Sequence, residues 1–158
     1  MIRRAKALAW LILAGVLWVC PPGSCPVAMA AGRDAVLHVW TLEPASLLWE
    51  VALPGDGRFC LGHVNSIYEA PVRECFQARP GGGCWLVEVQ SPSPAVFEYY
   101  GLEPPVTGRA VLRRPLGDFQ VRSHDYSRHH LTVGDRTLRL DQLAQPGQAL
   151  VFKVASTP

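Results

Sequence analysis

Residues 76–90, FQARPGGGCWLVEVQ, decide the fold class of this chain. They place a turn-forming run, PGGG at residues 80–83, between two β-prone segments, which is typical of a hairpin. In the second segment, Trp85, Val87 and Val89 alternate with polar residues, so we expect them to share the buried face of a strand. Glu88 and Gln90 are expected on the opposite face.

The same pattern continues on both sides of this hairpin. Residues 132–137, TVGDRT, predict a second tight hairpin around Gly134-Asp135. Short β-prone segments separated by glycine and proline recur along the chain. We expect strands at Ala35–Trp40, Leu47–Leu53, Arg58–His63, Val72–Ala78, Cys84–Gln90, Val96–Tyr100, Arg109–Arg113, Phe119–Arg122, His130–Val133, Arg136–Leu140 and Ala149–Val154.

Only Asp141–Ala144 reads as helix, and Gln145-Pro146-Gly147 ends it. Many short strands with so little helix predict an all-β fold. We expect a single antiparallel β-sandwich or barrel-like domain with at most one short helix.

The N-terminal segment predicts export. Arg3, Arg4 and Lys6 precede an uncharged apolar run at residues 7–19, and the small-residue pattern Ala28-Met29-Ala30 follows. This order is typical of a secretory signal, so residues 1–30 are expected to be removed and residues 31–158 to form the domain. The apolar run is shorter than the roughly 20 residues of a membrane-spanning helix. We therefore expect the protein in the periplasm, at the cell surface or outside the cell.

Removing the signal also changes the charge. The formal net charge of the chain is +2, and loss of the three N-terminal basic residues leaves −1. The exported domain therefore has no basic excess, which argues against nucleic acid as its partner.

Three cysteines remain after the signal, namely Cys60, Cys75 and Cys84. In an oxidising compartment two of them can pair and leave the third free. Opposite strands would bring Cys60 and Cys75 together across the Val64–Pro71 connection. The alternative is that all three stay thiols.

The segment Gly62–Phe76, which includes that connection, holds the most distinctive polar residues. Asn65 and Ser66 offer hydrogen-bonding groups, and Glu69 and Glu74 add carboxylates, on a loop between two strands where binding groups usually sit. His63 lies two residues before Asn65, so the two side chains would share a face of a strand. These five residues are candidate ligand- or partner-binding groups. The alternative is turn architecture, since Asn and Ser commonly cap turns.

Tyr99 and Tyr100 complete the candidate site. As neighbours on an expected strand they would face opposite ways, which leaves one of them exposed. The alternative for these and the other aromatic residues is core filling.

A second polar group consists of His124, Asp125, His129 and His130. His129 and His130 would point to opposite faces of a strand, and no helical spacing joins His124 to His129, so we predict a surface turn and no metal site. The sequence indicates no cofactor either.

A hydrolase is one alternative function. Ser66 would be its nucleophile and His63 its base, with Glu69 or Glu74 as the acid. However, the chain has no G-x-S-x-G elbow and no S-x-x-K motif, so we assign no catalytic residue.

The pattern Asn65-Ser66-Ile67, Pro71-Val72, Glu74 and Phe76 resembles the His-Ser-Val, Thr-Pro-Val, Glu and Phe signature of a small exported bacterial family of unknown function. A second segment, residues 97–104 (FEYYGLEP), is similar to that family's aromatic stretch, and the resemblance covers residues 47–154. Asn65 and Ala70 depart from it, since the family has His and Thr or Ser there.

Members of that family are often encoded beside tripartite (TRAP) solute transporters of the TAXI type. The resemblance therefore implies an exported binding or accessory protein with a TRAP component or a small solute as its partner. Besides the hydrolase, the other alternative is a structural envelope protein that keeps its N-terminal run as a membrane anchor.

Overall fold

A computed structural model describes residues 35–124 and 128–156. The expected signal peptide, residues 1–30, lies outside the described residues, as does Asp125. Within the described ranges, no helix has the length and apolar character needed to cross a membrane.

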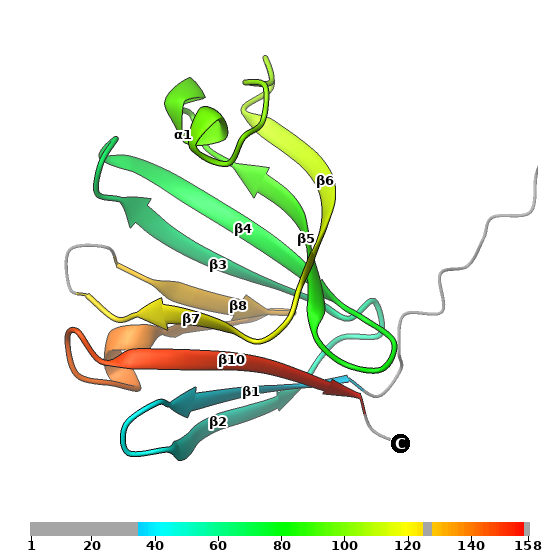
Figure 1. Cartoon of the computed structure of the whole chain (residues 1–158), viewed down its shortest axis with the longest axis vertical. Coiled ribbons are helices and arrows are strands. Elements are labelled where there is room, and N and C mark those ends of the chain that lie inside the picture. Colours follow the sequence, from blue (N-terminus) through cyan, green and yellow to red (C-terminus); the bar gives the residue numbers. More distant parts are fainter. Residues whose placement is uncertain (1–34, 125–127, 157–158) are drawn as a thin grey trace, which may run out of the picture.

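The fold is all-β and sandwich-like, as the sequence predicts, with ten strands in two antiparallel sheets (Figure 1). The smaller sheet has the order β2-β1-β10-β7, and the larger has the order β6-β5-β4-β3-β8-β9. In chain order the strands are β1 (Ala35–Thr41), β2 (Ser46–Ala52), β3 (Arg58–Asn65), β4 (Ala70–Ala78), β5 (Cys84–Gln90), β6 (Arg109–Leu116), β7 (Phe119–Arg122), β8 (His130–Val133), β9 (Arg136–Arg139) and β10 (Ala149–Ser156).

Four phenylalanines join the two sheets through the core. The rings of Phe59 and Phe76, on β3 and β4, stack with their centroids 5.1 Å apart. Phe76 stacks in turn on Phe119 of β7 at 4.9 Å, and Phe119 on Phe152 of β10 at 5.2 Å. Because each such side chain removes a large apolar area from water, this column fixes how the sheets pack.

Both predicted hairpins are present. The glycine-rich turn joins β4 to β5, and Val133 pairs with Arg136 in the β8–β9 hairpin. Glycine is required at Gly83, where φ is +70° and an added β-carbon would lie 3.0 Å from the carbonyl oxygen of Leu116.

The expected faces of β5 are right for Val89, Glu88 and Gln90 and wrong for Trp85. The pairing of β5 with β6 shifts between Leu86 and Glu88, so the strict alternation is broken. Leu86 and Val89 are buried in the core, whereas Trp85 is half-buried with the guanidinium carbon of Arg113 3.9 Å from its ring centroid.

The expected strand Val96–Tyr100 is also wrong, because this segment forms the helix α1 (Pro94–Tyr99). Ser93 is its N-cap residue and Pro94 opens its first turn, where a missing N–H costs nothing. The helix buries Val96 and Phe97 in the core. The helix expected at Asp141–Ala144 is instead a 3₁₀ turn, Leu140–Gln142.

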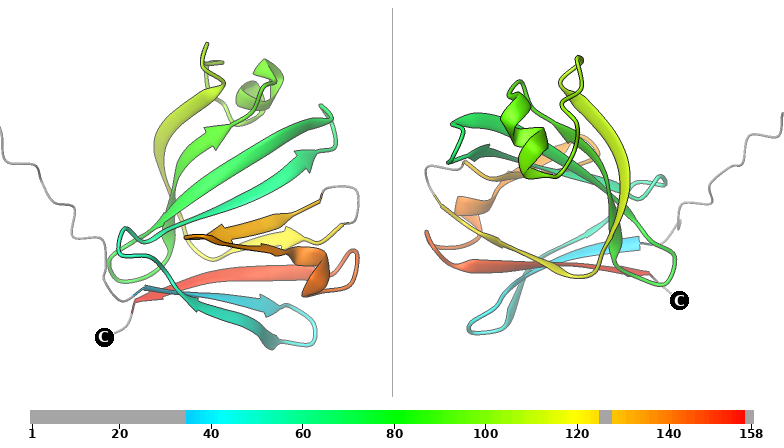
Figure 2. Two further views of the ribbon diagram at one scale, coloured as in Figure 1. Left: turned by 180° about the vertical axis from the view of Figure 1, so that it is seen from behind. Right: turned by 45° about the horizontal axis from the view of Figure 1, so that its top comes forward.

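Figure 2 shows α1 at the same end of the molecule as the β3–β4 turn. We call this the loop end. The face of the six-stranded sheet that points away from the smaller sheet is called the outer face.

Candidate functional site

The structure gathers most of the sequence-predicted site residues at the loop end. A cavity of about 190 Å³ lies there, between the β3–β4 turn, α1 and the residues that flank the β7–β8 connection. It is lined by His63, Val64, Asn65, Ser66, Ile67, Tyr99, His124 and His129. Glu74 and Tyr100 join this group through contacts with each other and with His63.

Asn65 shapes the turn. Its side-chain oxygen accepts hydrogen bonds from the backbone N–H groups of Ile67, at 2.9 Å, and Tyr68, at 3.2 Å. This is the capping role expected of Asn at such a position. Asn65 therefore holds the β3–β4 turn and thereby sets the position of Ile67.

Ser66 and Glu69 lie on the same turn. Ser66 is exposed, and no hydrogen bond between Ser66 and an imidazole exists among residues 35–124 and 128–156. Glu69 is exposed with φ at +48°, and it does not line the loop-end cavity. The arrangement thus shows no contact between a nucleophile and a base.

The Glu74 carboxyl and the Tyr100 hydroxyl are close neighbours. Burial raises the pKa of the Glu74 carboxyl, and the hydrogen bond with Tyr100 partly offsets this rise. Burial and the nearby Glu74 raise the pKa of the Tyr100 hydroxyl. Glu74 Oε2 also lies 3.9 Å from Nδ1 of His63, and that nitrogen is buried without a hydrogen bond.

His63 stacks on His129, with ring centroids 5.1 Å apart and an interplanar angle of 19°. Burial lowers the pKa of His63, and burial together with the neighbouring histidines lowers the pKa of His129 to about 4. The two rings therefore pack as neutral imidazoles near pH 7.

The predicted histidine group is divided between two faces. His124 and His129 line the loop-end cavity, whereas His130 lines a cavity on the outer face. In the described part of the chain, no three His, Cys, Asp or Glu side chains are placed to hold a metal ion.

Tyr99 and Tyr100 end α1, so the expectation that they face opposite sides of a strand is wrong. Their rings meet edge to face with centroids 5.7 Å apart. Tyr99 is 62% exposed, while Tyr100 is half-buried against the core.

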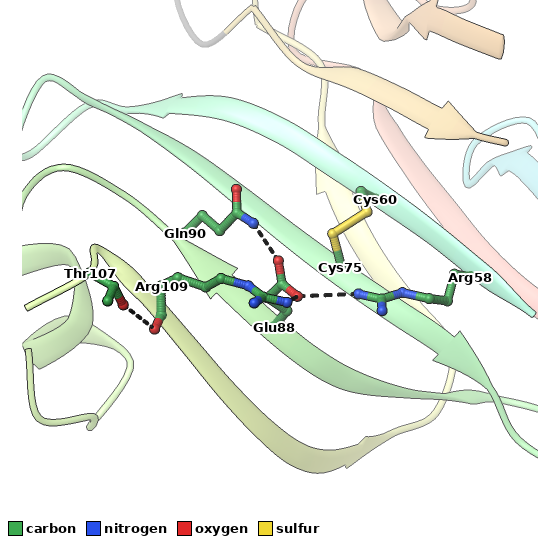
Figure 3. Close-up of polar contacts among 7 residues, drawn as sticks. All are labelled: Arg58, Cys60, Cys75, Glu88, Gln90, Thr107 and Arg109. Carbon is green, nitrogen blue, oxygen red and sulfur yellow. Dashed lines mark hydrogen bonds and ion pairs between the residues drawn. A yellow bond between two sulfur atoms is a disulfide. The ribbon is translucent and has the colours of Figure 1, made fainter. Parts of the chain in front are cut away.

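The outer face carries groups that the sequence analysis did not select. Cys60 and Cys75 lie opposite each other on β3 and β4 and form the expected disulfide, which leaves Cys84 as a buried free thiol (Figure 3). Beside the disulfide, Glu88 accepts hydrogen bonds from Arg58, at 3.3 Å, and Arg109, at 2.6 Å (Figure 3).

Glu88 has only 6% of its side chain exposed, and Gln90 donates a further hydrogen bond to its other oxygen. The hydrogen bond from Arg109 is the main reason that the pKa of Glu88 lies below its usual value. Arg58 and Arg109 are 30 and 21 residues away in sequence, so only the sheet register brings them to Glu88. No local pattern signals this cluster.

Two cavities hollow the outer face. The first, of about 600 Å³, includes Arg58, Arg109, Glu88 and the disulfide in its lining. The second, of about 680 Å³, extends toward the β3–β4 turn and includes His130. Arg73 of β4 lines both.

Comparisons with protein family models, curated proteins and solved structures found no match for this chain. The resemblance to a TRAP-associated family therefore stays a prediction based on its motif residues.

Proposed function

We propose that this protein is an exported accessory protein that binds another protein through its loop end. The observation that carries the proposal is the exposed apolar rim of the loop-end cavity. Ile67 is 68% and Tyr99 is 62% exposed there, although both are large apolar or aromatic side chains. Large exposed apolar groups that gather at one site are typical of a recognition surface.

The cavity itself favours a protein partner over a small molecule. Its volume of about 190 Å³ is below the roughly 300–1,000 Å³ of most small-molecule sites. The rim residues come from two elements, since Ile67 lies in the β3–β4 turn and Tyr99 ends α1. Asn65 caps that turn, so little conformational entropy is lost when Ile67 is buried by a partner.

Export and the identity of the partner belong to the same proposal. The N-terminal pattern predicts export, and the motif resemblance implies a component of a TRAP solute transporter as the partner. The partner is inferred from the resemblance to that family and not from a chemical feature of the loop end. The hydrolase alternative has no comparable support, because Ser66 makes no hydrogen bond with an imidazole among the described residues.

The test measures binding between the purified protein and the purified substrate-binding component of a TRAP transporter from the same cell. Ile67→Asp places a charge in the rim and should weaken binding by about tenfold or more. Leu47→Asp is the matched control, because Leu47 is an apolar residue of β2 that is 42% exposed and does not line the loop-end cavity. No binding, or equal weakening by both variants, would contradict the proposal.

A further inference from the structure

We propose that the outer face of the six-stranded sheet binds an organic monocarboxylate with an apolar body, and that Arg73 receives the carboxylate. This site differs from the loop-end rim of Ile67 and Tyr99, although its second cavity shares His63 and Val64 with the loop-end cavity, and it would bind a small molecule rather than a protein. The shape, the charge and the apolar lining of the two outer-face cavities support such a site.

The outer face is hollowed enough to hold a small molecule. The two cavities measure about 600 and 680 Å³, each within the range of small-molecule sites, and both have Arg73 in their lining. Arg73 lies on the central strand β4, opposite Gly62 of β3 and Gln90 of β5. A ligand that contacts Arg73 can therefore extend into either cavity.

In the first cavity, Arg73 is the arginine whose guanidinium is not paired with a carboxylate of the described residues. In the first cavity Arg58 and Arg109 are both engaged by Glu88. Arg73 has no hydrogen bond or ion pair with any residue in the two described ranges. Three guanidinium groups face two carboxylates, Glu88 and Asp56, so this cavity keeps a positive excess.

The guanidinium of Arg73 selects the anion, since it lines both cavities, whereas Arg128 lines the second cavity alone. The planar fork of Arg matches the two oxygens of a carboxylate, with which it forms two parallel hydrogen bonds. A phosphate dianion carries more charge and is better matched by several unpaired cations. Since Glu88 already neutralises part of Arg58 and Arg109, and Arg73 is the residue that the two linings share, a single carboxylate at Arg73 fits better.

The second cavity would hold the apolar part of the carboxylate ligand. Val64, Pro71 and Pro92 contribute apolar surface to it. Gly62 has no side chain, and the ring of His130 occupies the space over this glycine. Both residues line the cavity. A hydrocarbon chain or aromatic ring attached to the carboxylate would be transferred from water onto this apolar surface. That transfer is favourable in proportion to the apolar area buried.

The experiment is calorimetric titration of the purified protein with octanoate, octanamide, octyl phosphate and acetate. Octanoate should bind, and octanamide, which has the same chain without the charge, should bind at least about tenfold more weakly. Acetate should bind more weakly still, because each buried CH₂ adds up to about fourfold in affinity.

Two variants of Arg73 test whether its guanidinium binds the carboxylate. Arg73→Gln should reduce octanoate affinity by about tenfold or more, and Arg73→Lys should give an intermediate value because it keeps the charge but loses the fork. Arg122→Gln is the control, since it removes the same charge from an exposed position on β7 in the other sheet. Because Arg73 is exposed, its variants are expected to unfold at the temperature of the parent protein.

Several results would overturn the proposal. They are the absence of octanoate binding, equal binding of octanoate and octanamide, and an affinity that Arg73→Gln leaves unchanged. Tighter binding of octyl phosphate than of octanoate would overturn the assignment of a carboxylate. None of these results bears on the loop-end rim, which is tested with Ile67→Asp.

Discussion

The imidazole of His130 occupies the space where Gly62 would carry a side chain. A β-carbon built on Gly62 would lie 2.2 Å from Nε2 of His130, and the two residues are paired across β3 and β8. This close approach explains a glycine inside a strand, where glycine is otherwise unfavourable. It also makes His130 part of the floor of the second outer-face cavity.

Gly62→Ala should therefore force the ring of His130 to move and destabilise the protein. We expect the free energy of unfolding to fall by about 1–3 kcal/mol, as is typical of overpacking, in a urea titration. Gly55→Ala is the control, since no atom lies within 4 Å of the added carbon, and it should change stability by less than about 0.5 kcal/mol. Equal effects of the two substitutions would contradict the packing of His130 on Gly62.

The Cys60–Cys75 disulfide closes a loop of 15 residues. Replacing both cysteines by alanine should lower the free energy of unfolding by about 3 kcal/mol, mainly because the unfolded chain gains freedom. Peptide mapping without reductant should find the Cys60 and Cys75 peptides joined. A map with three free thiols would contradict the structure.

Cys84 should be unreactive in the folded protein. It is fully buried, and burial raises the pKa of its thiol to about 12, so almost no thiolate is present at pH 8. In the exported domain, residues 31–158, we expect iodoacetamide to label no cysteine before unfolding and one cysteine in denaturant without reductant, as counted by mass spectrometry. Rapid labelling of the native protein would show that Cys84 is accessible.

Stability should fall with acid because of the stacked pair His63 and His129. The pKa of His129 is about 4 in the folded state and 6.5 as the ordinary value, so the unfolded chain binds the proton first as pH falls. Its contribution is complete above about pH 6.5 and is lost progressively toward pH 4. The raised pKa of Glu74 acts with the opposite sign, since protonation of that group favours the folded state.

His129→Phe separates the two effects, because phenylalanine keeps a ring on His63 but does not titrate. Urea unfolding between pH 4 and pH 7 should show a smaller loss of stability for the variant than for the parent. Parallel curves for the two proteins would show that His129 is protonated equally in both states.

Glu69 sits in the left-handed region, with φ at +48°. A residue with a β-carbon is disfavoured there by about 1–2 kcal/mol, whereas glycine is not, although glycine loses more entropy on folding. We expect Glu69→Gly to raise the free energy of unfolding by about 0.5 kcal/mol and Glu69→Ala to leave it nearly unchanged. Destabilisation by glycine would show that the Glu69 side chain makes a favourable contact.

Most of the fold follows from local sequence signals. The PGGG run and the Gly134-Asp135 pair each place a turn, and β-prone segments on both sides then pair as hairpins. The helix α1 is missed because Val96, Phe97 and Tyr99 favour strands, and the burial of Val96 and Phe97 overrides that preference. The bulge in β5 has no local signal, since it depends on how β6 pairs with it.

The candidate functional residues, like the fold, could be predicted from the sequence only in part. His63 and Asn65 end β3 and Ser66 follows in the β3–β4 turn, so the three lie close together because they are close in sequence. Glu88 illustrates the part that sequence alone does not give. Its partners Arg58 and Arg109 come from strands on either side, and they meet only once the register of four strands is set.

The central claim is that the six-stranded sheet presents two separate binding regions, a protein-binding rim at the loop end and a carboxylate site on the outer face. Amide chemical-shift mapping by NMR during an octanoate titration tests this most directly. We expect shifts around Gly62, Arg73 and Gln90, with the amides of Ile67 and Tyr99 unchanged. Shifts centred on Ile67 and Tyr99, with Arg73 and its neighbours unchanged, would contradict it.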